Sequence, residues 1–198
     1  MKAEDAAEFM EREKSEDRFK TRAAIAISFF AMLLAITGLG GNNATKEALN
    51  ENVLASNDFT FFQAKNQRQT TYLLAANELE LTLRNPGLSD EAKAAISRRI
   101  EEYRRTVARY ESEPETGEGK KELLARAREH QIKRDHALTQ DPYFDYAEAL
   151  IQIAIVLISV SIVAEQTWLA FAGGGVGLLG ALLMLNGFLL FVHIPGLG

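Results

Sequence analysis

The sequence predicts an all-α integral membrane protein with three transmembrane helices and a long extramembrane antiparallel helical hairpin that is similar to a coiled coil. Apolar residues are collected in three nearly charge-free blocks, at residues 23–39, 147–164 and 168–192. Each block is about as long as the roughly 20 residues that a helix needs to cross a bilayer. A fourth stretch, residues 43–85, contains neither glycine nor proline and predicts one unbroken helix.

Composition narrows the classes of partner and chemistry. The 198-residue chain has a formal net charge of −5, which argues against nucleic acid as a partner, because phosphate binding requires clustered positive charge. The absence of cysteine excludes disulfides, thiolate catalysis and cysteine-based metal sites. The mean hydropathy of −0.10 averages two different chemistries, a lipid-facing part and a charged helical part.

The first 22 residues are predicted to form an acidic tail, either solvated or folded as a short amphipathic helix. Its basic residues gather at its end, as Arg18, Lys20 and Arg22, directly before the first predicted span at residues 23–41. Positive charge beside a span favours the cytoplasmic side. We therefore expect a cytoplasmic N-terminus and a periplasmic location for residues 42–141.

Residues 42–141 are predicted to form the extramembrane hairpin. The helix of residues 43–85 ends at Pro86 and Gly87, and Ser89 is placed to cap the helix that follows. On that second helix, apolar residues recur at intervals of four and three, which predicts a heptad seam of Ile96, Ile100, Tyr103, Val107 and Tyr110.

The returning part of the hairpin is predicted to be interrupted. Pro114, Gly117 and Gly119 mark a solvated break, after which residues 120–139 continue as a charged helix. At 1.5 Å per residue, the outgoing helix is about 63 Å long and the two returning helices together are about 67 Å long. The matching lengths favour an antiparallel hairpin with both ends at the bilayer.

Two further spans are predicted after the hairpin, at residues 142–164 and 168–192. Asp141 and Pro142 are suited to the N-cap and first position of a new helix that leads into the second span. Only Glu165, Gln166 and Thr167 separate the two spans, so we expect a tight transmembrane turn.

A heptad drawn along residues 43–85 places several amides at its core positions. Polar residues at such positions reduce stability but fix the register and oligomeric state of paired helices. We interpret the line as a self-association seam; in the alternative, Asn66 and Gln69 face solvent. The residues assigned to the seam are Asn52, Ala55, Phe59, Phe62, Asn66 and Gln69.

The same stretch carries a family resemblance. The runs Ala55-Ser56-Asn57-Asp58 and Phe61-Phe62-Gln63-Ala64-Lys65 follow a first membrane span and precede a C-terminal pair of spans. In this arrangement the chain resembles the uncharacterised bacterial membrane proteins of the domain-of-unknown-function 4337 family. The resemblance covers nearly the whole chain and implies a membrane protein, but it implies no catalytic residues.

Two sets of residues are candidates for contacts inside the membrane. Gly173, Gly177 and Gly180 have the small-residue spacing that lets a neighbouring helix approach closely, within the chain or in another subunit. Thr37, Gln152 and Asn186 are predicted to lie at similar depth in their spans. Because polar side chains in hydrocarbon need partners, we expect an interhelical cluster of these three, or in the alternative an ion or substrate pathway.

Nothing in the sequence predicts catalysis, a cofactor or a metal ion. His130, His136 and His193 lack the four-residue spacing of a helical metal site, and we interpret the first two as residues of a solvated helix face. Gly173-Gly174-Gly175 lies inside an apolar span, without the strand and lysine that a phosphate loop requires.

These observations favour a non-enzymatic, oligomeric scaffold or assembly protein of a bacterial inner membrane, with the lipid bilayer and further copies of itself as partners. Two alternatives stay open at this point. One is a homo-oligomeric pore or ring lined by Asn, Gln and Thr side chains, and the other is an accessory subunit of a larger respiratory or photosynthetic complex.

Overall fold

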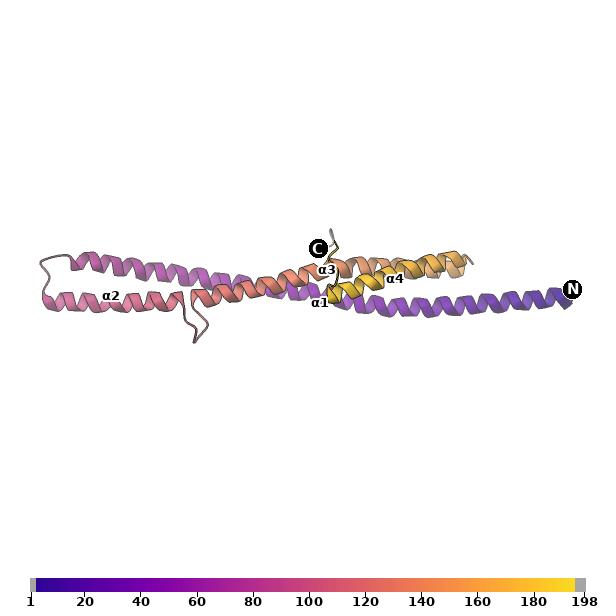
Figure 1. Cartoon of the computed structure of the whole chain (residues 1–198), viewed down its shortest axis with the longest axis horizontal. Coiled ribbons are helices and arrows are strands. Elements are labelled where there is room, and N and C mark those ends of the chain that lie inside the picture. The colour runs from indigo at the N-terminus through magenta and orange to yellow at the C-terminus, as the bar shows by residue number, and fades with distance from the viewer. Residues whose placement is uncertain (1–2, 195–198) are drawn as a thin grey trace. The chain divides into compact units, whose positions relative to one another are not determined.

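The computed structural model describes residues 3–194, and for residues 3–9, 11 and 12 only the backbone. These residues form four α-helices, α1 (Ala3–Leu83), α2 (Asp90–Glu111), α3 (Lys120–Val163) and α4 (Thr167–Leu189), and no strand (Figure 1). The prediction of an all-α fold is confirmed. Helices α1, α3 and α4 each contain a stretch long and apolar enough to cross a membrane.

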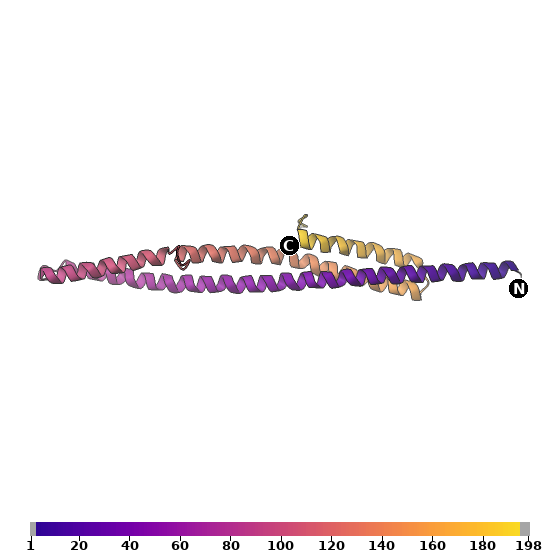
Figure 2. The ribbon, with the colours of Figure 1, turned by 90° about the horizontal axis from the view of Figure 1, so that it is seen from below.

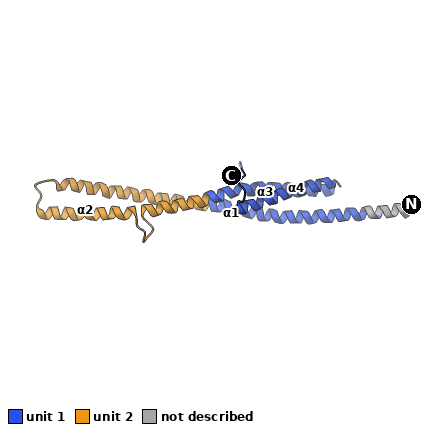
Figure 3. Ribbon diagram, viewed as in Figure 1, with its two compact units in different colours: residues 1–48, 135–198 blue, residues 49–134 orange. Residues whose placement is uncertain are grey.

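The chain forms two compact units (Figure 3). Unit 1 consists of the described residues of Met1–Ala48 and Asp135–Gly198, and unit 2 consists of Leu49–Arg134. Helix α1 begins in unit 1 and ends in unit 2, and α3 begins in unit 2 and ends in unit 1. The apolar blocks of the sequence belong to unit 1, and unit 2 contains most of the charged residues.

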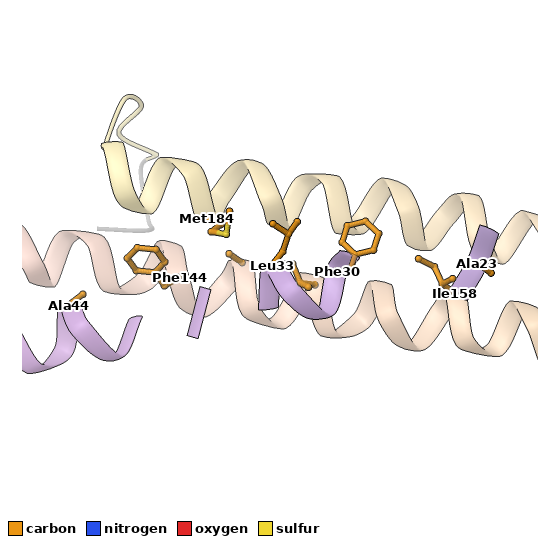
Figure 4. Close-up of a cluster of buried hydrophobic side chains, with 9 residues drawn as sticks. Ala23, Phe30, Leu33, Ala44, Phe144, Ile158 and Met184 are labelled. Atoms are coloured by element: carbon orange, nitrogen blue, oxygen red, sulfur yellow. The ribbon is translucent and has the colours of Figure 1, made fainter. Parts of the chain in front are cut away.

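Unit 1 has a core of apolar side chains from α1, α3 and α4 (Figure 4). The buried cluster is Ala23, Phe30, Leu33, Ala44, Phe144, Ala147, Ile151, Ile158 and Met184. Phe144 lies against Gly40, where an added Cβ would come within 2.6 Å of its ring, and edge-on to Phe188 at 4.8 Å between centroids. The ring therefore fits because α1 has no side chain at this point.

The prediction that a new helix starts at Pro142 is wrong, because α3 continues through this residue. A proline inside a helix removes one backbone hydrogen bond and crowds the preceding turn. The two residues that follow, Tyr143 and Phe144, are buried in unit 1, and their packing offsets that cost. Asp141 does not act as an N-cap; its carboxylate accepts a hydrogen bond from the Thr45 hydroxyl at 2.8 Å.

In unit 2, the C-terminal part of α1 lies beside α2 and the first part of α3 in both views (Figures 1 and 2). Tyr72 packs against Tyr103 with 5.4 Å between ring centroids, whereas Asp58, earlier in α1, binds Arg126, later in the chain. The two sides therefore run antiparallel. The least exposed line on α1 is Glu51, Ala55, Asp58, Phe62, Lys65, Gln69, Tyr72, Ala76, Leu79 and Leu83.

Both ends of α2 have the local chemistry that the sequence predicted. The Ser89 side chain caps its start by accepting a hydrogen bond from the backbone N–H of Ala92 at 3.2 Å, which confirms the predicted N-cap. At its other end, residues 112–119 form the predicted break between α2 and α3. The Glu122 carboxylate closes this loop by accepting hydrogen bonds from the Ser112 hydroxyl at 2.6 Å and the Glu113 backbone N–H at 3.1 Å, which lower the pKa of Glu122.

Candidate functional site

Charged residues recur every seven positions on the inward side of α1 in unit 2: Glu51, Asp58 and Lys65. Seven residues are close to two turns, so the three side chains lie on the same side of the helix. Each side chain is only 10 to 12% exposed. We call these three residues and their partners on α2, α3 and the connecting loop the ion-pair ladder.

The central step of the ladder joins Asp58 to Arg126 of α3. Arg126 donates two hydrogen bonds to the two carboxylate oxygens, from Nε at 2.8 Å and from Nη2 at 2.7 Å. This paired geometry is among the strongest that side chains form, and it fixes the position of one helix along the other. The hydrogen bonding of Arg126 to Asp58 is also the main reason why the pKa of Arg126 is raised.

His130 extends the ladder toward Glu51. Its Nδ1 lies 2.5 Å from Glu51 Oε2, and its Nε2 lies 3.9 Å from Asp58 Oδ2. The interpretation of His130 as part of a solvated face was wrong: its side chain is 17% exposed, because Leu123, Ala127 and His130 follow the intervals that turn α3 toward α1. His136 is exposed.

The next step of the ladder is Lys65, which the acidic loop between α2 and α3 covers. Lys65 Nζ lies 3.2 Å from Glu118 and 3.8 Å from Glu113, both of that loop, and 5.7 Å from the centroid of the Tyr110 ring. The loop residues that the sequence marked only as a solvated break therefore supply counter-charges to a lysine that the helix pair has largely removed from water.

Gln69 is the point in unit 2 where α1, α2 and α3 meet. Its Nε2 donates to the Val107 carbonyl and to the Glu111 carboxylate, both at 3.0 Å, while its Oε1 accepts from Lys120 Nζ at 2.7 Å. Lys120 also lies 3.2 Å from Glu111. The hydrogen bonds from Gln69 and then Lys120 lower the pKa of Glu111.

Three of the six residues assigned to the self-association seam lie one position away from the inward line of α1. Ala55, Phe62 and Gln69 belong to the inward line of α1, and Phe59 beside it is half-buried, but Asn52 and Asn66 are exposed. The inward positions next to them are Glu51 and Lys65. The hydrogen bonds of Gln69 are made within the chain. Self-association of this protein stays a prediction.

One signal in the sequence indicates the ladder residues that the prediction missed. Between residues 49 and 77 of α1, the charged residues are Glu51, Asp58, Lys65 and Arg68, and the first three are seven residues apart. A regular interval of charges in a stretch otherwise almost free of charge indicates a shared helix face. The predicted seam instead used the neighbouring positions Asn52, Phe59 and Asn66, and it left the three charged residues without a role.

In unit 1, the predicted packing glycines lie against α3 and α1. An added Cβ at Gly173 would lie 3.0 Å from the Ala154 carbonyl oxygen, and one at Gly180 would lie 3.1 Å from that of Ala147. One at Gly177 would overlap the Phe30 ring. All three glycines are buried, so the contacts are made inside the chain.

Thr37, Gln152 and Asn186 make their hydrogen bonds in three different places. The buried Thr37 hydroxyl donates to the Leu33 carbonyl of its own helix at 2.8 Å, and Gln152 donates to Glu148 on α3 at 3.0 Å. Asn186 accepts from the Val192 N–H at 2.9 Å and donates to its carbonyl at 2.8 Å. These hydrogen bonds therefore do not join the three side chains to one another.

Asn186 instead holds the segment that follows α4. Leu190 ends the helix in a left-handed conformation, and the chain then turns back over α3. There the Tyr143 hydroxyl accepts a hydrogen bond from the Ile194 N–H at 3.0 Å and donates one to the Val192 carbonyl at 3.3 Å. The side chains of Asn186 and Tyr143 thus provide hydrogen-bond partners for backbone groups of Val192 and Ile194, which lie outside any helix.

Comparison with protein families gives one match, to a domain of unknown function (DUF4337), over residues 19–190. The matched region includes the apolar parts of all three candidate spans and the whole of unit 2. No curated protein and no solved structure gives a significant match.

We predict that Asp58→Asn destabilises unit 2 by about 1–3 kcal/mol, because it leaves Arg126 without its counter-charge in a partly buried site. Glu129→Gln is the matched control, since it breaks an exposed pair with Lys133, and we expect it to cost less than about 1 kcal/mol. Chemical unfolding followed by circular dichroism measures both. Equal effects of the two substitutions would contradict the ladder's role.

We also predict that Gly180→Leu lowers the free energy of unfolding of unit 1 by about 1–3 kcal/mol, because the new side chain would collide with the backbone of α3. Gly175→Leu places the same side chain in open space and is expected to leave the thermal midpoint in mild detergent nearly unchanged. The close packing of α3 and α4 is refuted if both variants melt together with the parent protein.

Proposed function

The chain belongs to the DUF4337 family, a domain of unknown function, and we propose that it is a non-enzymatic membrane scaffold that assembles as a homo-oligomer in a bacterial inner membrane. Unit 1 would anchor it in the bilayer, and unit 2 would be a coiled-coil-like helical hairpin outside the bilayer. The observation that carries the proposal is the ion-pair ladder, which fixes the register of α1 against α2 and α3.

The membrane part of the proposal rests on unit 1. Its three candidate spans combine a small buried core with large apolar side chains that are more than half exposed, such as Phe29, Val156 and Leu182. Exposed apolar area of this extent is unfavourable in water and favourable against lipid tails. The glycine contacts between α3 and α4 supply the close van der Waals packing that replaces the hydrophobic effect inside a bilayer.

The mechanical part of the proposal rests on unit 2. Among the described residues, no buried side-chain nitrogen or oxygen lacks a hydrogen-bond partner. The polar side chains between the helices bond to one another across α1, α2 and α3, as Asp58 does with Arg126 and Gln69 with Lys120. A sliding of α1 by one turn would separate all of these partners at the same time. The geometry therefore supports a stiff element that holds its partners at fixed positions.

The orientation follows from charge beside the first span. Arg18, Lys20 and Arg22 directly precede the apolar stretch of α1, which favours a cytoplasmic N-terminus. One crossing by α1 then places residues 42–141 in the periplasm, and the two remaining crossings place the end of α4 there too. The Tyr143 hydroxyl, near the start of the second span, hydrogen-bonds to the backbone of Val192 and Ile194, which is consistent with this crossing order.

We predict that the 198-residue chain forms a homo-oligomer in native nanodiscs or mild detergent, with a mass that is a fixed multiple of 21.9 kDa. Native mass spectrometry or light scattering measures this directly. A closed ring of many copies would favour a pore, and stable co-purification of a different protein would favour an accessory subunit. A monomer at all accessible concentrations would contradict the scaffold.

Orientation is tested with single cysteines, because the chain has none of its own. We predict that Glu115→Cys, in the exposed loop between α2 and α3, reacts with a membrane-impermeant maleimide in cells whose inner membrane is intact. Lys20→Cys, exposed beside the first span, is expected to react only after lysis. The reverse pattern would overturn the proposed topology.

A further inference from the structure

Between residues 49 and 77, one face of α1 carries no charge. It consists of three lines of residues spaced seven apart, which start at Leu49, Asn50 and Val53, and we call it the uncharged face. Its members are Leu49, Asn50, Val53, Ser56, Asn57, Thr60, Gln63, Ala64, Gln67, Thr70, Thr71, Leu74 and Asn77. All of its residues are exposed, and every one is aliphatic, an amide or a hydroxyl residue. Leu49, Val53 and Leu74 are each more than half exposed, so the face presents apolar area that unit 2 itself leaves uncovered.

The distribution of charge on α1 is the reverse of that on an ordinary surface helix. Three of its four charged residues between positions 49 and 77 point inward to the ion-pair ladder. The outward residues of α2 and α3 are instead densely charged, as with Arg98, Glu101 and Arg105 on α2. Between residues 49 and 77, charge is thus concentrated between the helices and on α2 and α3, and it is absent from the uncharged face of α1.

The three threonine hydroxyl groups of the uncharged face already have hydrogen-bond partners. Thr60, Thr70 and Thr71 each donate to a backbone carbonyl four residues earlier, at 2.8, 2.9 and 3.0 Å. Removing water from these side chains therefore leaves no hydroxyl donor without a partner. Their methyl groups then add to the apolar area that can be buried.

We propose that the uncharged face binds the same face of a second copy of this chain, side by side and in parallel. This inference rests on the proposed function, and it names the surface through which the scaffold assembles. Docking of the face on the charged sides of α2 or α3 would strip water from charges that it cannot pair, whereas two uncharged faces meet without that cost. A shared two-fold axis makes the contact self-complementary.

The polar residues of the face suit a parallel pairing. Both copies leave the bilayer after the same span, at residues 23–41, so their α1 helices share one direction and each residue faces its own counterpart. Amides such as Asn57 and Gln67 carry both a donor and an acceptor, so each can bond to the identical side chain opposite. Amides at such positions select parallel, in-register pairs. They also make the face unsuited to lipid tails.

Disulfide formation in the full-length protein tests the contact. We predict that Thr60→Cys and Gln67→Cys each give covalent dimers under mild oxidation in native membranes. Ser97→Cys, also at an exposed position but on α2, is the matched control and is expected to give at least about tenfold less dimer. Equal yields at Ser97 and Thr60, no yield at Thr60 and Gln67, or capture of a different protein at these positions would overturn the proposal.

A charge variant tests the same surface without cysteine. Gln67→Glu places two like charges opposite each other and is expected to weaken the dimer at least about tenfold, whereas Ser97→Glu leaves it unchanged. Co-expression of Gln67→Glu with Gln67→Lys is expected to restore a mixed dimer. Loss of dimer with no rescue by the lysine variant contradicts the contact.

The failure of this inference is distinguishable from the failure of the proposed function. If native mass measurements show an oligomer while Thr60→Cys and Gln67→Cys stay uncrosslinked, the copies meet elsewhere, and only the uncharged face is excluded. If the protein is a monomer in every condition, both proposals fail.

Discussion

The ion pairs between α1 and its partners in unit 2 determine how the rest of that unit is arranged. Glu51, Asp58 and Lys65 are spaced at seven residues, so turning one of them inward turns all three. Once inward, each needs a partner at its own level, and His130, Arg126 and Glu118 supply these partners in antiparallel order. A contact made by charged side chains stabilises paired helices less than an apolar contact of the same size. It allows far fewer alignments of one helix along the other, however.

The same arrangement explains two features that look unrelated in the sequence. The loop of residues 112–119 is acidic because Glu113 and Glu118 reach back to Lys65, which needs counter-charge. The uncharged face of α1 lacks charge because three of the four charged residues between positions 49 and 77 point inward. In the apolar core of unit 1, glycine residues set the helix contacts, as Gly40 does for Phe144 and Gly180 for the backbone of Ala147.

The local elements of this fold were predictable, and the phase of the central seam was not. Ser89 as a cap and the break after α2 follow from backbone chemistry that neighbouring residues decide, so the sequence predicts them correctly. The inward line of α1 depends on partners far away in the chain. The predicted seam contained Asn52 and not Glu51, and His130, which holds Glu51 on the inward side, follows much later in the chain. Pro142 was misjudged for the same reason, since the burial of Tyr143 and Phe144 outweighs a local rule.

The central claim is that charged side chains of α1 are held inside unit 2. The most direct test is the rate at which individual lysines react with an amine-specific reagent in the folded protein, read out by peptide mass spectrometry. Lys65 and Lys120, 12 and 14% exposed, are predicted to react much more slowly than Lys93 and Lys133, 42 and 48% exposed, and to reach the same rate after denaturation. Equal rates for all four lysines in the folded protein would contradict the account.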